Sequence, residues 1–306
     1  MNFRTEIQIK KSAEKINHTQ KVLLLGSCFA QNMQVKFAEG GFEAMHPFGA
    51  IYNPYSVANS FKLIAENKPI AEESLFFEKD KWNSYAFHSS YSNADKNEAL
   101  RQMSEAVNEA NEILNSENPI IVVTLGTSWV YELNETGEIV ANCHHSAASS
   151  FTRRAMSVEE ITQVLKPICQ TGKRVIFTVS PVRHLKDGAH ENQISKSRLL
   201  LAVDTLCSEH ANCEYFPSYE IVLDELRDYR FFAEDMAHPT ALAVDYIWER
   251  FVDTYFSDKT IEGIKEYEKI VKTEKHRPSN PESEQYLSLL EKIKNDKNNW
   301  TKKYKS

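Results

Sequence analysis

The sequence feature that most constrains the fold is a short apolar run that ends in a glycine. The segment Lys21 to Leu25 is too short for a helix and too apolar for an exposed edge, so we expect a buried strand of a parallel sheet that ends at Gly26. From Cys28 the apolar residues recur at helical spacing up to a glycine pair at 40–41. Ser27 therefore falls where a strand turns into a helix, at the sheet edge where ligands usually bind.

A serine at such a turn suits two different roles. Its hydroxyl lies near the positive end of a helix dipole, beside backbone N–H groups that could hold a developing oxyanion. Small residues are also common at strand-to-helix turns as packing and capping residues. The turn alone leaves both roles for Ser27 open.

The rest of the chain alternates strands and helices in the order that a parallel sheet requires. Further strands are predicted at 120–125, 174–179 and 214–216, and helices at 54–66, 100–114, 161–169 and 193–207. We expect an aromatic-rich irregular stretch at 75–91, and a hairpin at 131–140 that turns at 135–137. The pattern predicts an α/β fold with a parallel central sheet.

A second segment supplies partners for a nucleophile at the turn. A nucleophilic serine needs a base to take its proton and a carboxylate to orient that base, and Asp235 and His238 are the right two types. Two residues separate them, and Pro239 suits the first turn of a following helix, so both side chains can project from one short loop. The alternative is that His238 only caps that helix, whose apolar residues form a core stripe.

These segments resemble the GSCFA family, which is related to the SGNH/GDSL esterases and acylhydrolases. The resemblance rests on Gly-Ser-Cys-Phe-Ala at 26–30 and continues through short motifs to about residue 255, namely Asn53-Pro54, Gly126–Trp129, Asn142–His144, Ser180–His184, Tyr215–Glu220 and Asp228–Phe231. It implies a three-layer α/β/α fold. It also implies that Ser27 is the nucleophile, His238 the general base and acid, and Asp235 the orienting carboxylate.

The resemblance further implies an oxyanion hole. In SGNH enzymes the nucleophile's own N–H is joined by a glycine N–H and an Asn side chain, so Ser27 and Gly49 are the expected backbone donors. Ser128 stands where the Asn is usually found. A hydroxyl can donate a hydrogen bond but is shorter than an amide, so Asn142 or His144 is expected to reach in if Ser128 does not.

Several residues are candidates for binding the substrate. Arg183 and His184 follow a predicted strand, so they should lie on the same rim as Ser27, either holding a polar group of a substrate or holding their own loop together. His144 follows the predicted hairpin and could close over that rim. A group of aromatic residues forms either a wall for a sugar or acyl group, or part of the core. These residues are Trp82, Tyr85, Phe87, Trp129 and Tyr131.

The five cysteines cannot all pair and show no disulfide framework, so we expect reduced thiols. Cys28 is an alternative nucleophile, because a thiol at a helix N-terminus can have a lowered pKa. Against this, its position one residue into the helix should turn it toward the sheet as a small buried group. The adjacent Cys143, His144 and His145 are poorly spaced for zinc, and we predict no metal and no cofactor.

Composition and charge limit the classes of partner and the location. The net charge of −7 argues against a nucleic-acid binder, and no apolar run is long enough to span a bilayer. The N-terminus carries charges throughout and lacks the apolar segment of a secretory signal, so we expect a cytoplasmic protein. We predict a catalytic domain at 1–256 and a charged helical extension at 257–306, broken at 277–281, which packs against the body or mediates self-association.

Together these expectations predict an SGNH-like serine esterase that works through an acyl-enzyme. Family likeness implies a substrate in which a polar molecule, such as a carbohydrate, carries a short acyl group. An acyltransferase with the same triad is one alternative, because it shares every step except the last. A non-catalytic carbohydrate-binding protein is another, motivated by the serine at position 128.

Overall fold

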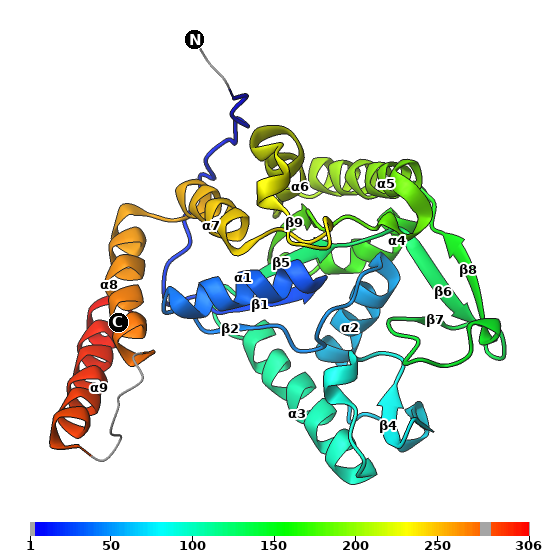
Figure 1. Ribbon diagram of the computed structural model, residues 1–306, viewed down its shortest axis with the longest axis horizontal. Coiled ribbons are helices and arrows are strands. Elements are labelled where there is room, and N and C mark those ends of the chain that lie inside the picture. The colour runs from blue at the N-terminus through cyan, green and yellow to red at the C-terminus, as the bar shows by residue number, and fades with distance from the viewer. Residues whose placement is uncertain (1–3, 276–282, 306) are drawn as a thin grey trace.

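The computed structural model describes residues 4–275 and 283–305 and is built around a five-stranded parallel sheet (Figure 1). The strands are β1 (Val22–Gly26), β2 (Ala44–Met45), β5 (Ile120–Leu125), β9 (Arg174–Val179) and β10 (Cys213–Tyr215). Their order across the sheet is β10-β9-β5-β1-β2, with parallel pairing throughout. The predicted parallel sheet is confirmed, and its strand order reverses direction between β1 and β5.

Helices cover both faces of this sheet because its strands are apolar on both sides. Val22 and Leu24 face a core that contains α1 (Cys28–Glu39) and α7 (Ala241–Tyr255). Leu23 and Leu25 face the other core, which is formed with α2 (Pro54–Glu66), α3 (Lys96–Leu114), α4 (Val158–Cys169) and α5 (Gly188–Glu209). The result is the expected three-layer α/β/α arrangement.

Two small antiparallel sheets extend the layers beside the carboxyl edge. Strands β3 (Leu75–Glu78) and β4 (Lys81–Ser84) form a hairpin in the stretch that we expected to be irregular, so that expectation is wrong. The hairpin of β6 (Trp129–Leu133) and β7 (Ile139–Val140) is confirmed, and it gains a third strand, β8 (Phe151–Ala155), that the sequence did not reveal. The three middle residues of β8, Thr-Arg-Arg, are polar, and none of its residues is fully buried.

Short helical turns complete the described chain. They are η1 (Glu72–Ser74), η2 (Ser89–Tyr91), η3 (Ala148–Ser150), η4 (Leu185–Asp187), α6 (Ser218–Glu220), η5 (Ile221–Leu226) and η6 (Tyr229–Phe231). None of the helices within the described residues combines the length and the apolar character needed to cross a bilayer.

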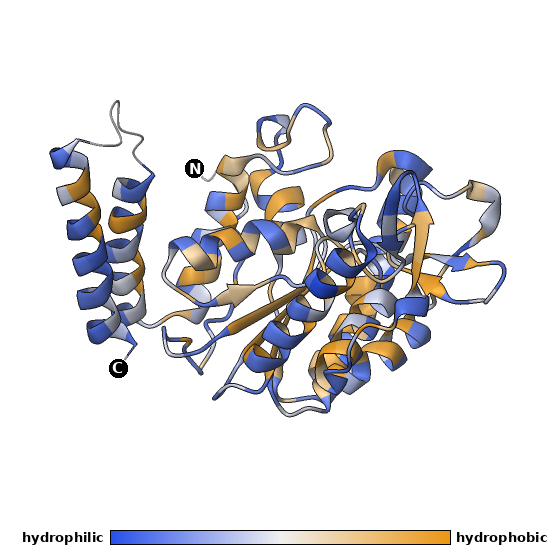
Figure 2. Ribbon diagram, turned by 90° about the horizontal axis from the view of Figure 1, so that it is seen from below, coloured by the Kyte–Doolittle hydropathy of each residue, from blue (hydrophilic) through white to orange (hydrophobic). Residues whose placement is uncertain are grey.

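The C-terminal extension is a helical hairpin of α8 (Asp258–Glu274) and α9 (Glu284–Tyr304). Figure 2 shows it beside the main body, with more hydrophilic residues than the central strands. Trp300 is buried, donates from Nε1 to the Gly263 carbonyl at 2.8 Å, and meets the His18 ring edge to face at 4.7 Å. The extension therefore packs against the body, which was one of the two expected alternatives. The predicted break at 277–281 lies outside the described residues.

Candidate active site

The candidate site lies at the carboxyl ends of β1 and β5, where the strand order reverses. In parallel sheets this is the usual position of a ligand crevice. Gly26 ends β1 with φ +126°, and a Cβ at this position would lie 2.0 Å from the carbonyl oxygen of Thr124 on β5. Only glycine fits this close approach of two strands, which sets the direction in which the chain enters α1.

Ser27 has a structural role in this turn. Its Oγ accepts from the backbone N–H of Phe29 at 3.3 Å, which makes it the N-cap of α1, and its own N–H donates to the Thr124 carbonyl at 3.0 Å. The side chain is buried, with the residue 1% exposed. The expectation that the Ser27 N–H is free to hold an oxyanion is therefore wrong, because the sheet already uses this donor. The neighbouring Cys28 is only half-buried.

Asp235 and His238 form the contact that their spacing predicts. Asp235 Oδ2 lies 2.6 Å from His238 Nδ1, and Asp235 Oδ1 accepts from the backbone N–H groups of Ala237 at 2.9 Å and His238 at 3.0 Å. The backbone N–H of His238 is the main reason why the pKa of Asp235 lies well below its usual range, followed by that of Ala237 and the imidazole. A carboxylate that stays ionised can orient the ring through Nδ1 and leave Nε2 to exchange protons.

The alternative role of His238 as a helix cap is wrong. Helix α7 begins at Ala241, and its N-cap is Thr240, whose hydroxyl accepts from the Ala243 N–H at 3.3 Å. His238 therefore does not cap this helix, and half of its side chain is exposed.

Arg183 holds the loop that carries this pair. Its guanidinium donates to the Met236 carbonyl and lies 4.3 Å from the centre of the Phe232 ring, and its backbone N–H donates to the Ala237 carbonyl at 3.1 Å. The expected role of Arg183 in holding its loop together is therefore present, with a backbone carbonyl as the partner of its guanidinium. Because these contacts hold Met236 and Ala237, Arg183 fixes the loop that carries Asp235 and His238.

A cavity of about 450 Å³ opens beside the pair. Its walls contain five residues that the sequence pointed to, His238, Asn142, Trp129, Arg183 and His184. They also contain Tyr52, Arg153 and Asp187, which sequence reasoning missed. These three belong to none of the quoted motifs, and they reach the cavity from the loop after β2, from β8 and from η4.

One wall of the cavity is an aromatic surface covered by a cation. The guanidinium of Arg153 lies 4.0 Å from the centre of the Trp129 ring and is fixed by two hydrogen bonds to Asp187, at 2.8 and 2.5 Å. Tyr131 lies beside them on β6. Of the aromatic residues proposed as a wall, Trp129 and Tyr131 line this cavity, whereas Phe87 is fully buried in the core.

Two residues predicted to act in the site face elsewhere. Ser128 is fully buried, and its N–H and Oγ contact Ser195 Oγ on α5 at 2.8 and 3.2 Å, so its assignment as an oxyanion donor is wrong. His144 is also buried, and its Nε2 donates to the carbonyls of Ser84 at 2.7 Å and Phe87 at 3.0 Å. It anchors the loop after β7 instead of binding a substrate.

The other two oxyanion candidates remain near the cavity. Asn142 lies in its wall and accepts from the His144 N–H at 2.9 Å through Oδ1, which leaves the side-chain amide nitrogen as its donor. Gly49 adopts φ +68°, and a Cβ there would lie 2.5 Å from Cβ of His88, a residue that lines the cavity. No described contact tests either residue as an oxyanion donor, so both stay predictions.

A buried lysine that sequence reasoning did not select lies at the carboxyl ends of β5 and β9. Lys196 on α5 is 1% exposed, and its Nζ donates to the carbonyls of Gly126 at 2.7 Å and Ser180 at 2.8 Å, just beyond β5 and β9. Burial lowers the pKa of Lys196 to about 7. Burial, with a smaller contribution from Lys196, also lowers the pKa of His184 to about 4, so the His184 ring in the cavity wall is neutral near pH 7.

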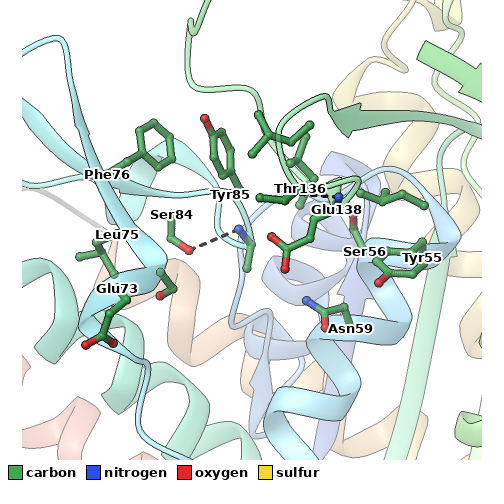
Figure 3. Close-up of a pocket in the computed structure, with 16 residues that line it drawn as sticks. Tyr55, Ser56, Asn59, Glu73, Leu75, Phe76, Ser84, Tyr85, Thr136 and Glu138 are labelled. Carbon is green, nitrogen blue, oxygen red and sulfur yellow. Dashed lines mark hydrogen bonds between the residues drawn. The ribbon is translucent and has the colours of Figure 1, made fainter. Parts of the chain in front are cut away.

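A second cavity of about 330 Å³ adjoins the first and shares Val140 and Ala141 with it. Figure 3 shows the Glu138 carboxylate and the Asn59 amide facing each other there, with Tyr55 on the same helix as Asn59. Phe76 and Tyr85 stack at 4.1 Å between ring centres and line the same cavity. It therefore combines hydrogen-bonding groups with aromatic surface.

Within the described part of the chain, no three His, Cys, Asp or Glu side chains gather where they could hold a metal ion.

Comparison with known proteins identifies the family. A search of curated proteins found no match to this chain. The family model of the GSCFA family matches residues 21–251, a span that runs from the strand before the Gly26 turn through most of α7. The expected extent of the resemblance, about 20 to 255, is thus confirmed, and the chain belongs to the GSCFA family.

Proposed function

We propose that this protein hydrolyses an acyl ester through an acyl-enzyme intermediate. The observation that carries this proposal is the 2.6 Å contact between Asp235 Oδ2 and His238 Nδ1 in a loop beside a cavity at the carboxyl edge of the sheet. The relation of GSCFA proteins to SGNH esterases supports the same reaction.

In the proposed reaction, His238 accepts the proton of a nucleophile supplied by the turn of Ser27 and Cys28. The nucleophile attacks the ester carbonyl, and His238 then gives the proton to the departing alcohol. Water, deprotonated by the same ring, releases the acyl group. The family relation predicts Ser27 as the nucleophile, whereas its burial and capping bond favour a structural role.

The cavity walls favour a polar substrate with a short acyl group. The Trp129 and Tyr131 rings add aromatic surface to a cavity wall that also carries the Arg153 guanidinium, and Asn142 offers a donor for the oxygens of a sugar. The adjoining cavity with Asn59 and Glu138 could take a further hydroxyl-bearing unit, because its amide and carboxylate match hydroxyl groups. We therefore propose an acylated carbohydrate or a similar polar ester as the substrate class.

The test is turnover of p-nitrophenyl esters of increasing chain length and of fully acetylated sugars. We expect the parent protein to release short acyl groups and His238→Ala to lose this activity, while His190→Ala, which changes an exposed histidine on α5, retains it. Acyl transfer to an added alcohol in place of water would make the protein an acyltransferase.

A carbohydrate-binding protein without catalysis is a second candidate, favoured by the burial of Ser27 and Ser128. It requires that the parent bind sugars, measured by calorimetry, with unchanged affinity after His238→Ala and without turnover of any ester. Release of acyl groups by the parent but not by the His238→Ala variant would exclude it.

A further inference from the structure

Two adjacent side chains compete for the role of nucleophile, and the structure treats them differently. The Ser27 hydroxyl is buried and caps α1, and its N–H is paired with β5. Cys28, the first residue of α1, is half-buried and carries a free thiol. We propose that Cys28, and not Ser27, is the nucleophile that forms the acyl-enzyme, and this inference rests on the proposed function.

The surroundings of Cys28 link it to the proposed base. Its sulfur interacts electrostatically with Asp235, the carboxylate that holds His238, and with the phenol of Tyr52, which lines the cavity. It also interacts with Lys196, which lies beneath the carboxyl ends of β5 and β9. Cys28 is thus within electrostatic reach of Asp235, of Tyr52 in the cavity wall and of the buried Lys196.

The same position supplies donors for an oxyanion. The backbone N–H groups of Cys28 and Phe29 lie close enough to the sulfur to favour its thiolate. Both belong to the first turn of a 12-residue helix, where the dipole favours negative charge. The Phe29 N–H already donates to Ser27 Oγ, so the Cys28 N–H is the donor that this proposal assigns to the oxyanion. With Cys28 as nucleophile, its own N–H replaces that of Ser27, which the sheet has taken.

Burial determines how this thiol must react. Desolvation outweighs the nearby donors and the charge of Lys196, so the pKa of Cys28 is raised instead of lowered as its helix position suggested. At neutral pH Cys28 is therefore a thiol and needs a base. His238, which Asp235 orients, is the base that this proposal assigns to Cys28.

The chemistry balances without a cofactor. His238 takes the S–H proton, the sulfur attacks the ester carbonyl carbon, and a carbon–sulfur bond forms. The carbon–oxygen bond of the ester then breaks, and the departing alkoxide takes the proton from His238, leaving a thioester. Water attacks the thioester while His238 accepts its proton, the carbon–sulfur bond breaks, and the proton returns to the thiolate of Cys28.

Cys143 is the competing thiol, because it lines the cavity directly. It lies in the loop after β7, burial raises its pKa, and its charged neighbour is Lys186, with no interaction with Asp235 among the described contacts. It therefore lacks the interaction with Asp235 that Cys28 has, and it serves as the matched control for Cys28.

The first experiment traps the acyl-enzyme of the parent protein during turnover of p-nitrophenyl acetate, with acid quenching and peptide mass spectrometry. We expect the acyl group on Cys28 and its removal by neutral hydroxylamine, which cleaves thioesters much faster than serine esters. Cys28→Ala should lower kcat at least about 10³-fold. Ser27→Ala should still form the thioester. A hydroxylamine-stable adduct on Ser27, or an adduct on Cys143, would overturn the proposal while leaving the hydrolase intact.

The second experiment needs no ester substrate and therefore separates the two proposals. Alkylation by iodoacetamide at pH 7 should proceed at Cys28 several-fold more slowly after His238→Ala, whereas the rate at Cys143 should not change. Equal Cys28 rates in the two proteins would contradict the proposal. Activation of Cys28 by His238 without turnover of any ester would instead refute ester hydrolysis and retain Cys28 as the activated nucleophile.

Discussion

Asp235→Asn should disable His238 while leaving its loop folded. An asparagine Oδ1 can still accept from the N–H groups of Ala237 and His238, which now lie 2.9 and 3.0 Å from the carboxylate. Its NH₂ group, however, would face His238 Nδ1 in place of the oxygen at 2.6 Å. Two donors cannot pair, so the ring must take the tautomer that carries hydrogen on Nε2. In that form His238 cannot accept a proton from a nucleophile.

The size of the loss follows from how well the pair is shielded. For a buried carboxylate that orients a catalytic histidine, the same change costs about 10⁴-fold in kcat. Here the side chains are half exposed, 51% for Asp235 and 50% for His238, so water can partly replace the lost acceptor. We therefore expect kcat to fall by about 10² to 10⁴-fold, with the smaller loss favoured by the exposure.

The assay is steady-state hydrolysis of a short p-nitrophenyl ester, with circular dichroism to confirm folding. Asp228→Asn is the matched control, because Asp228 accepts from the Arg230 N–H at 3.0 Å in the same exposed region without contacting the histidine. A folded Asp235→Asn variant with kcat within threefold of the parent would refute the view that Asp235 controls the protonation of His238.

Three further predictions concern stability, each measured by urea denaturation. Gly26→Ala should cost at least about 3 kcal/mol of unfolding free energy, because the new Cβ would lie 2.0 Å from the Thr124 oxygen and φ is +126°; a loss below 1 kcal/mol would contradict this. Trp300→Ala should cost about 3–5 kcal/mol through a cavity and the lost bond to Gly263 if the hairpin is part of the folded body. An unchanged midpoint would show that the extension folds separately. Burial lowers the pKa of Lys196 to about 7 from 10.5, so between these values the unfolded chain binds a proton that the folded chain has lost, and stability rises with pH. Lys196→Met should remove that rise, and an identical pH dependence would count against it.

The fold was predictable where local pattern and global packing agree. Apolar segments such as 120–125 and 174–179 are buried on both faces, so their length and composition identify them as central strands. The accessory strands were harder to identify, because β8 reads Phe-Thr-Arg-Arg-Ala and pairs at the surface. A loop separates β8 from its partner β6 in the chain. The pairing of these two strands therefore leaves no local pattern in the sequence.

The site residues, like the strands, were predictable only where their contacts are local in the chain. The Asp235 and His238 contact was predictable because both residues lie in one short turn, where spacing almost fixes the geometry. Ser128 and His144 were not, because each is bonded to a segment distant in the chain, namely α5 and the region around Ser84. A motif identifies which residue stands at a position, whereas the direction of its side chain depends on which distant donor or acceptor is nearest.

The amino-acid sequence by itself determined the parallel α/β sheet, the turn after β1, the Asp235–His238 pair and membership of the GSCFA family, since all of these depend on local patterns or short spacings. Only the tertiary structure decided that Ser27 is buried as a cap, that Cys28 lies within electrostatic reach of Asp235, and that Lys196 reaches the ends of two strands. The physical reason is that burial and electrostatic neighbours arise from contacts between segments far apart in the chain, and these contacts decide which of two adjacent side chains is buried and which stays partly exposed.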